Sequence, residues 1–216
     1  LHTLAGKPAL ISSRLRGSHV ETANLQQVEA VGNLMADLHM AACHITEDYH
    51  GTRDNKWLEN TVYQASTLLS ADEKTQVQDT LTQYLTWDLA KLPHGIIHGD
   101  LFRDNVFFDG DKLTGVIDFY SAGVGFLLFD LAVVVNDWCR NENNTLDKER
   151  TNALLAAYCA KRPWTEQEQL CWPLMQQIAA MRFWLSRLLS RTNLKENSLF
   201  ISKDPAEFRT LYYSLL

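Results

Sequence analysis

The sequence lacks features that would assign it to several large functional classes. No apolar run approaches the length of a membrane span, and no basic segment followed by an apolar one opens the chain. Basic residues are not in excess, because 20 Lys and Arg stand against 26 Asp and Glu and give a formal net charge of -6. We therefore expect neither a membrane nor a nucleic acid as a partner.

Cysteine is scarce, and its positions lack the paired spacing that zinc and redox sites use. We expect free thiols in a reducing cytoplasm at Cys43, Cys139, Cys159 and Cys171. The histidines make no helical metal face either, so no structural metal is expected. Internal repeats and low-complexity tracts are absent as well, which favours a single lobe.

The most informative segment that is present spans residues 96–120. Short apolar runs flank the loop 98–105 and predict two strands. Asp109-Gly110 has turn chemistry and predicts a hairpin between the second run and the next apolar run. That hairpin would return Asp118 to the end of the strand where Asn105 begins.

Two carboxylates and an amide then lie at the strand ends, as phosphoryl transfer from a magnesium nucleotide requires. Asp100 fits the base that accepts the proton of the attacking hydroxyl. Asn105 and Asp118 fit the oxygen ligands of Mg²⁺, the metal that accompanies ATP. The alternative is that Asp100, Asp104 and Asp118 are solvated turn acids and Asn105 a turn former. The predicted strand context favours the kinase site.

These residues resemble the catalytic loop and metal-binding segment of the protein-kinase-like superfamily. Gly99 stands where protein kinases have Arg, Tyr120 stands where they have Gly, and no Ala-Pro-Glu segment follows. His-Gly-Asp-Leu with Ile-Asp-Phe is similar to the aminoglycoside phosphotransferase branch, whose members phosphorylate small molecules. Within that branch, five segments of the chain resemble the homoserine kinases: 98–106, 115–120, 130–132, 136–139 and 182–188.

The resemblance implies a mostly helical α+β fold: a protein-kinase-like C-terminal lobe with short β-hairpins at 18–216. Residues 1–17 would be a remnant of the small N-terminal lobe, namely its last strands and the hinge, with the backbone of Ser13 and Leu15 facing adenine. An ordinary surface hairpin is the alternative. Neither a Gly-x-Gly-x-x-Gly loop nor a plausible strand Lys is found. Half of the ATP site is thus expected outside this sequence, and the fragment alone is expected to be inactive.

Other residues are candidates for supporting the loop and for binding the substrate. The resemblance implies that His98 braces the loop and that Asp130 hydrogen-bonds its backbone, although Asp130 is also placed to cap a helix. A partly buried Arg182 needs an anion, either the carboxylate of an amino-acid substrate or a protein acid such as Asp137. Arg103, Asp137 and Trp138 are further candidates for the substrate site.

The resemblance implies transfer of the γ-phosphate of ATP, with Mg²⁺, to the side-chain hydroxyl of L-homoserine. The product, O-phospho-L-homoserine, feeds threonine biosynthesis. Open alternatives are an aminoglycoside, choline or methylthioribose acceptor, or a non-catalytic kinase-like module. The sequence does not determine the oligomeric state.

Hydrophobic spacing and caps predict helices in the remaining segments. Ser70 and Glu73 form a capping box that starts one of them. The glycines at 123 and 125 predict a loop over 121–126, and residues 51–55 are also expected to be a loop. The predicted helices cover 24–43, 70–89, 147–161, 165–191 and 205–216.

Overall fold

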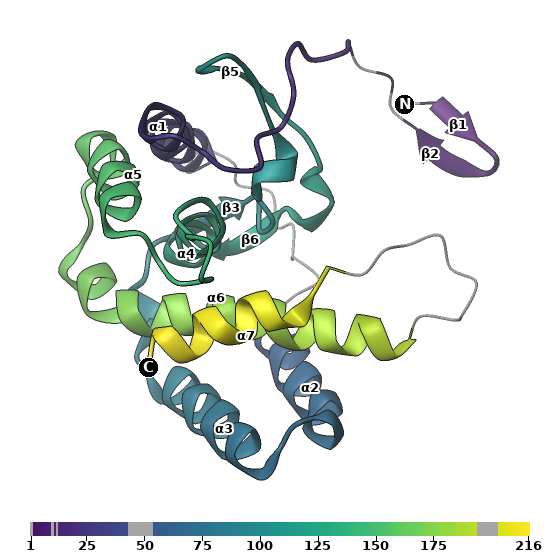
Figure 1. Cartoon of the computed structure of the whole chain (residues 1–216), viewed down its shortest axis with the longest axis vertical. Helices are drawn as coiled ribbons and strands as arrows, with labels where there is room; N and C mark the ends of the chain where they lie inside the picture. The colour runs from purple at the N-terminus through teal and green to yellow at the C-terminus, as the bar shows by residue number, and fades with distance from the viewer. Residues whose placement is uncertain (1, 10, 12, 43–53, 194–202) are drawn as a thin grey trace.

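The computed structural model describes residues 2–9, 11, 13–42, 54–193 and 203–216 (Figure 1). Its helices are α1 (Leu25–Ala42), α2 (Asn55–Ala65), α3 (Ala71–Thr86), α4 (Leu127–Trp138), α5 (Lys148–Lys161), α6 (Glu166–Asn193) and α7 (Pro205–Ser214). Its strands are β1 (His2–Leu4), β2 (Lys7–Ala9), β3 (His94–Ile97), β4 (Val106–Asp109), β5 (Lys112–Val116) and β6 (Gly123–Phe126). The predicted mostly helical α+β fold is confirmed.

The strands form three antiparallel pairs, each of two strands. β1 pairs with β2 and β4 with β5, both as hairpins, and the second hairpin is the one that Asp109-Gly110 predicts. β3 instead pairs with β6, with Ile96 opposite Val124. The loop 98–105 leaves β3 and enters β4, so it connects two different strand pairs.

α4 occupies the centre of the molecule, between two hydrophobic clusters (Figure 1). Leu128 and Val133 pack into the cluster that α2, α3, α6 and α7 build, whereas Leu131 and Val134 pack into the one that α1 and α5 build. A helix buried on both sides is apolar all round. The acids that α4 does carry are therefore held in the interior.

α6 runs across the molecule, and α7 lies along it (Figure 1). Aromatic side chains fill the seam: the ring centroids of Phe183 and Phe208 are 5.4 Å apart, and those of Trp184 and Tyr212 are 5.5 Å apart. On α6, Met181, Trp184 and Leu185 are buried in this seam, and Leu188 is partly buried.

Most predicted helices are confirmed to within a few residues. The capping box is present, with the Ser70 hydroxyl accepting from the Glu73 amide and the Glu73 carboxylate accepting from the Ser70 amide, although α3 ends at Thr86. The sequence reasoning missed α2. Cys43 and residues 51–53 of a predicted loop lie outside the described residues.

The predicted loop over 121–126 is wrong, because residues 123–126 form β6. A Cβ atom at Gly125 would lie 2.5 Å from Cδ1 of Ile97, on the paired strand. The glycine therefore allows the two strands to approach with the Ile97 side chain between them. It serves close packing and does not mark a turn.

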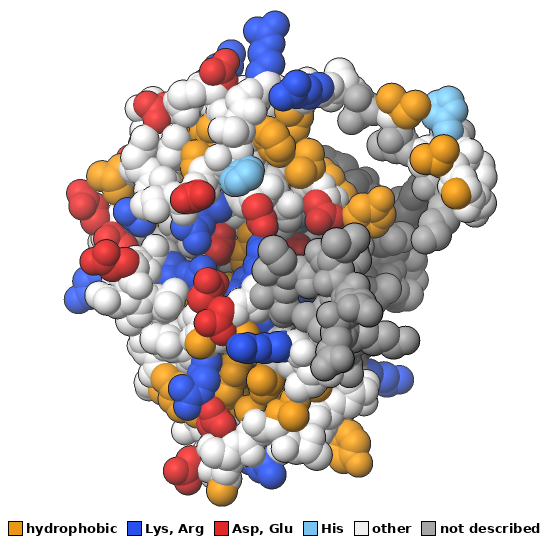
Figure 2. Space-filling model, turned by 45° about the vertical axis from the view of Figure 1, so that its right-hand side comes forward, with side chains coloured by type: hydrophobic (Ala, Val, Ile, Leu, Met, Phe, Trp, Pro, Cys, Tyr) orange, Lys and Arg blue, Asp and Glu red, His pale blue; other side chains and the backbone are white. Residues whose placement is uncertain are grey.

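The distribution of surface charge and the state of the described cysteines match the expectations from the sequence. Acidic and basic side chains are interspersed over the face shown in Figure 2. Cys139, Cys159 and Cys171 are free, as predicted. No helix in the described part of the chain has the length and apolarity needed to cross a membrane.

Candidate active site

The loop 98–105 is anchored from behind by one buried carboxylate. Asp130 in α4 accepts hydrogen bonds from the backbone amides of His98 (2.8 Å) and Gly99 (2.7 Å). Gly99 has a φ of +74°, and a Cβ there would lie 2.9 Å from the backbone oxygen of Ser121. Of the two predicted roles for Asp130, the structure shows the loop contact and not the cap, since α4 begins three residues earlier.

A second interaction holds Asp130 in its charged form. The ring nitrogen Nε2 of His39 lies 3.2 Å from the Asp130 carboxylate, and Nδ1 lies 2.8 Å from the Tyr158 hydroxyl. Burial raises the pKa of Asp130, but His39 and the amides of His98 and Gly99 outweigh it and hold the pKa below its usual value. Sequence reasoning missed His39, because nothing local links residue 39 to residue 130.

His98 ties the loop to the segment that carries Asp118. Its Nδ1 accepts from the amide of Asp100 (3.3 Å), and its Nε2 donates to the carbonyl of Ile117 (3.1 Å). These partners assign the proton to Nε2, because a carbonyl can only accept. The ring therefore connects the neighbours of the two candidate acids.

Asp100, Asn105 and Asp118 meet in one cleft of about 270 Å³. The Asn105 amide nitrogen donates to the carbonyl of Asp100 (2.8 Å), and the carbonyl of Asn105 accepts from the amide of Ile117 (3.0 Å). Asp118 has a left-handed backbone, with φ 66° and ψ 57°. Such a conformation is strained for most residues and is frequent at functional sites.

The opposite wall of this cleft comes from α6 and the segment before α7. It consists of Phe183, Ser186, Arg187 and Lys203. The Lys203 ammonium contacts Asp104, which lines the same cleft. The arrangement offers carboxylates, an amide and two cations around a space large enough for a small alcohol and a phosphate group.

Three of the residues predicted for substrate, Arg103, Asp137 and Trp138, instead make contacts that hold the loop. The Asp137 carboxylate accepts from the backbone amide of Arg103 (2.8 Å) and from its Nε (3.2 Å). Trp138 is fully buried, and its indole nitrogen donates to the carbonyl of Leu101 (3.0 Å). Trp138 thus supports the loop from the core and does not line the cleft, a correction of the sequence-based interpretation.

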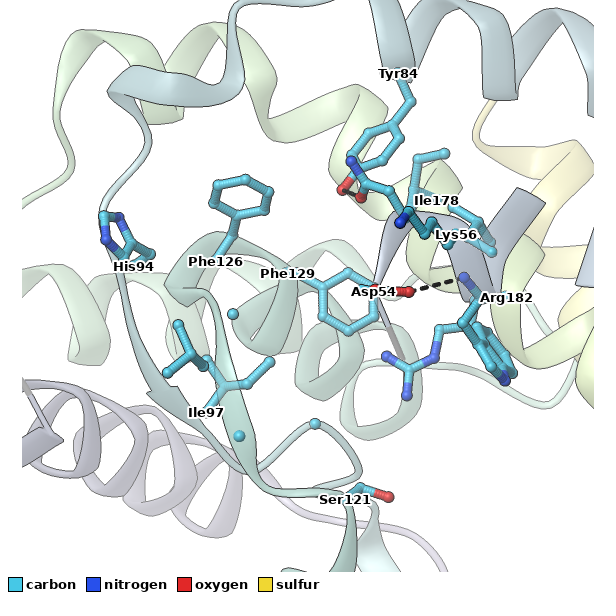
Figure 3. Close-up of a pocket in the computed structure, with 17 residues that line it drawn as sticks. Asp54, Lys56, Tyr84, His94, Ile97, Ser121, Phe126, Phe129, Ile178 and Arg182 are labelled. Atoms are coloured by element: carbon cyan, nitrogen blue, oxygen red, sulfur yellow. Dashed lines mark hydrogen bonds between the residues drawn. The ribbon is translucent and has the colours of Figure 1, made fainter. Parts of the chain in front are cut away.

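Arg182 lies in a second, larger cavity of about 530 Å³ that Gly99 and Ser121 also line (Figure 3). Its guanidinium stacks among aromatic rings, 4.8 Å from the Phe129 centroid and 5.5 Å from that of Trp57. Asp137, the protein acid predicted as an alternative partner, pairs with Arg103 and with Arg140 (3.6 Å). Arg182 and Asp100 line different cavities.

The proposed hinge runs beside the second hairpin. Ser18 and Phe108 form a two-way backbone bridge, and the Leu15 side chain packs over Gly115 in β5. Ser13 is exposed. The predicted first hairpin is present as β1 and β2, and residues 1, 10 and 12 lie outside the described residues.

Comparison with known proteins assigns the family. A model of the phosphotransferase enzyme family matches residues 1–166. A homoserine kinase of Methylobacillus flagellatus is 42% identical over 216 residues, which are 100% of this chain and 68% of that protein. A homoserine kinase of Pseudomonas aeruginosa is 40% identical over 210 residues, 96% of this chain and 66% of that protein. The chain thus spans about two thirds of the length of these relatives.

Solved structures with the same fold are kinases of small molecules. The amicoumacin kinase hAmiN matches with a TM-score of 0.62 at 15% identity, over 94% of this chain and 61% of its own. A choline/ethanolamine kinase family protein from Mesorhizobium loti matches with a TM-score of 0.61 at 16% identity, over 87% of this chain and 61% of its own. At such identities the likeness concerns the fold alone. Together with the sequence relatives, it leads to one conclusion: the chain belongs to the phosphotransferase enzyme family and, within it, to the homoserine kinases.

Proposed function

We propose that the full-length protein transfers the γ-phosphate of ATP to the side-chain hydroxyl of L-homoserine and releases O-phospho-L-homoserine. The observation that carries the proposal is the single cleft lined by Asp100, Asn105 and Asp118. The identity to curated homoserine kinases, 42% and 40% for the two compared above, supports this acceptor over other alcohols.

Asp100 is the proposed base. Its backbone is fixed on both sides, by the amide contact to His98 and by the carbonyl contact to Asn105. A carboxylate held this way orients the hydroxyl and accepts its proton as the oxygen attacks the γ-phosphorus in line. His98 and Asp130 act as positioning residues through the loop.

The donor set fits Mg²⁺, which prefers hard oxygen ligands and keeps several positions for water and phosphate. Asn105 and Asp118 would hold the ion, the first through Oδ1, because its amide nitrogen is engaged by the loop carbonyl. In the described part of the chain, no three His, Cys, Asp or Glu cluster to hold a metal on their own. Bound Mg²⁺ would neutralise negative charge on the phosphates of ATP.

Residues 1–17 are proposed to be the end of the small lobe and the hinge, with the backbone of Ser13 and Leu15 at the adenine edge. The contact of Leu15 with β5 supports this placement, because β5 leads directly to Asp118. Arg182, in the neighbouring cavity, is retained as a candidate for contact with the substrate.

An acceptor panel tests the proposal. The full-length protein is given Mg-ATP with homoserine, choline, methylthioribose or an aminoglycoside, and ADP release is measured. We expect turnover with homoserine well above that with the other three. Turnover restricted to another acceptor would refute the substrate but not the reaction class, and no turnover with any alcohol would refute both.

A further inference from the structure

The guanidinium of Arg187 is the most rigidly held cation in the cleft of Asp100. Its Nη1 donates to the Glu207 carboxylate (2.9 Å) and to the carbonyl of Asp204 (3.2 Å). Its central carbon lies 4.5 Å from the centroid of the Phe208 ring, and only 10% of the side chain is exposed. Among the described residues, no other hydrogen-bond partner of this group is found. Nε and Nη2 therefore remain as donors.

Arg187 also ends a chain of ion pairs that starts at Arg103 in the loop 98–105. Arg103 pairs with Asp137 (3.2 Å), and Arg140 lies between Asp137 (3.6 Å) and Glu207 (3.2 Å). Glu207 then pairs with Arg187. Three positive groups thus alternate with two negative ones, which leaves one positive charge in excess.

Of the three arginines in this chain of ion pairs, Arg187 is the one that lines the cleft. Arg140 is 6% exposed and has a carboxylate on either side, so its charge is compensated within the protein. Burial raises the pKa of Glu207, but the hydrogen bond from Arg187 and the charge of Arg140 outweigh it and keep the pKa below its usual value. Glu207 stays anionic but is shared with Arg140, so it does not fully neutralise Arg187.

We propose that Arg187 binds the α-carboxylate of the acceptor while Asp100 receives the hydroxyl proton. This assignment rests on the proposed function and names the residue that selects an anionic acceptor. A guanidinium with two remaining donors and a fixed plane is suited to a carboxylate, which it grips through two parallel hydrogen bonds. The second cation of the cleft, Lys203, contacts Asp104 and is a weaker candidate.

Arg187 and Arg182 line different cavities, and this difference favours Arg187 as the residue that binds the carboxylate. Both belong to α6, but only Arg187 lines the cleft that contains Asp100. The Arg182 guanidinium stacks on Phe129 and Trp57 in the larger cavity. A substrate as short as homoserine must present its hydroxyl and its carboxylate within one cleft.

The test compares two acceptors in steady-state assays of the full-length protein. L-Homoserine carries the carboxylate, and 3-aminopropan-1-ol is the same amino alcohol without it. For Arg187→Met we expect the KM for homoserine to rise about 10- to 100-fold, the loss expected for a charge-assisted contact. The KM for ATP and the kcat/KM for 3-aminopropan-1-ol should stay within about threefold, a shift below 1 kcal/mol.

Three further variants complete the design. Arg187→Lys keeps the charge and the contact to Glu207 but loses the fork, so its KM for homoserine should lie between wild type and Arg187→Met. Arg191→Met is the matched control, because this cation of the same helix is 67% exposed and lies outside the cleft. Arg182→Met tests the competing anchor, and thermal unfolding of each variant reports on folding.

Each outcome decides between the alternatives. A selective loss with homoserine supports the proposal. Equal losses with both acceptors, a change confined to the KM for ATP, no change at all, or a selective loss in Arg182→Met instead of Arg187→Met would overturn it. If wild type phosphorylates another alcohol but not homoserine, the proposed function fails, and this result is distinct from those above.

Discussion

Replacing Asp130 by Asn should uncouple the loop 98–105 from α4. The carboxylate accepts two backbone amides and faces the His39 ring. Asn keeps one accepting oxygen and turns an NH₂ group toward one of these donors. One charge-assisted hydrogen bond is lost and a buried N–H is left unpaired, which together cost on the order of 3–5 kcal/mol of unfolding free energy.

Urea unfolding of wild type and Asp130→Asn measures this difference, and Asp109→Asn is the matched control, because Asp109 is an exposed acid at the end of β4. The control should change the unfolding free energy by less than about 0.5 kcal/mol. The displaced loop should also lower kcat about 100-fold, since small misplacements of reacting groups are costly. A destabilisation of Asp130→Asn within about 1 kcal/mol of the control would refute the reasoning.

The pH dependence of the same variant has a defined sign. The pKa of Asp130 is lowered in the folded protein from its ordinary value of 3.8, so the unfolded chain binds the proton more readily. The stabilisation is therefore complete above the unfolded pKa and is lost as the pH falls through the folded one. The difference between wild type and Asp130→Asn should therefore be constant above about pH 5 and should shrink as the pH falls below the ordinary pKa of 3.8. A difference that grows on acidification would contradict the assignment.

Three further outcomes are expected. Asp100→Asn should lower kcat by about 10²- to 10⁴-fold while the Kd for Mg-ATP, measured by calorimetry, is unchanged, and near-normal turnover would remove Asp100 from the base role. Gly125→Val should lower the free energy of unfolding by about 1–3 kcal/mol in urea titrations, because its Cβ meets Ile97, and the added Ile97→Ala should restore part of it; a neutral Gly125→Val would contradict the packing argument. Burial raises the pKa of Cys139 to about 12, so mass spectrometry should find this thiol unlabelled by iodoacetamide at about pH 8 in the folded protein and labelled in urea. Rapid labelling of the folded protein would argue against its burial.

The hairpin that carries Asp118 could be predicted from the sequence because its information is local. Asp109-Gly110 fixes the turn and the pairing next to it, although the register shifts between Phe107 and Phe108. The capping box at Ser70 is local in the same sense. Such signals lie within a few residues of the structure that they determine, and for that reason the convergence of Asp100, Asn105 and Asp118 could be anticipated.

The predictions that failed depended on partners distant in the sequence. A tryptophan at position 138 is compatible with a pocket, but its indole nitrogen donates to the carbonyl of Leu101, 37 positions away in the sequence. The sequence around Gly125 is typical of a turn, but in the structure this residue pairs with Gly95 of β3. The contact of His39 with Asp130 joins residues 91 positions apart, a separation that no spacing rule covers.

Because the backbone of Asp118 is left-handed, an aspartate at this position lowers the stability of the fold, although the proposed chemistry requires its carboxylate. Glycine adopts these dihedral angles without strain, so Asp118→Gly should raise the free energy of unfolding. A search for thermostable variants would thus tend to select a substitution that removes the carboxylate proposed to bind Mg²⁺. Screens that score melting temperature alone would enrich inactive protein, and a carboxylate at residue 118 must be imposed as a separate requirement.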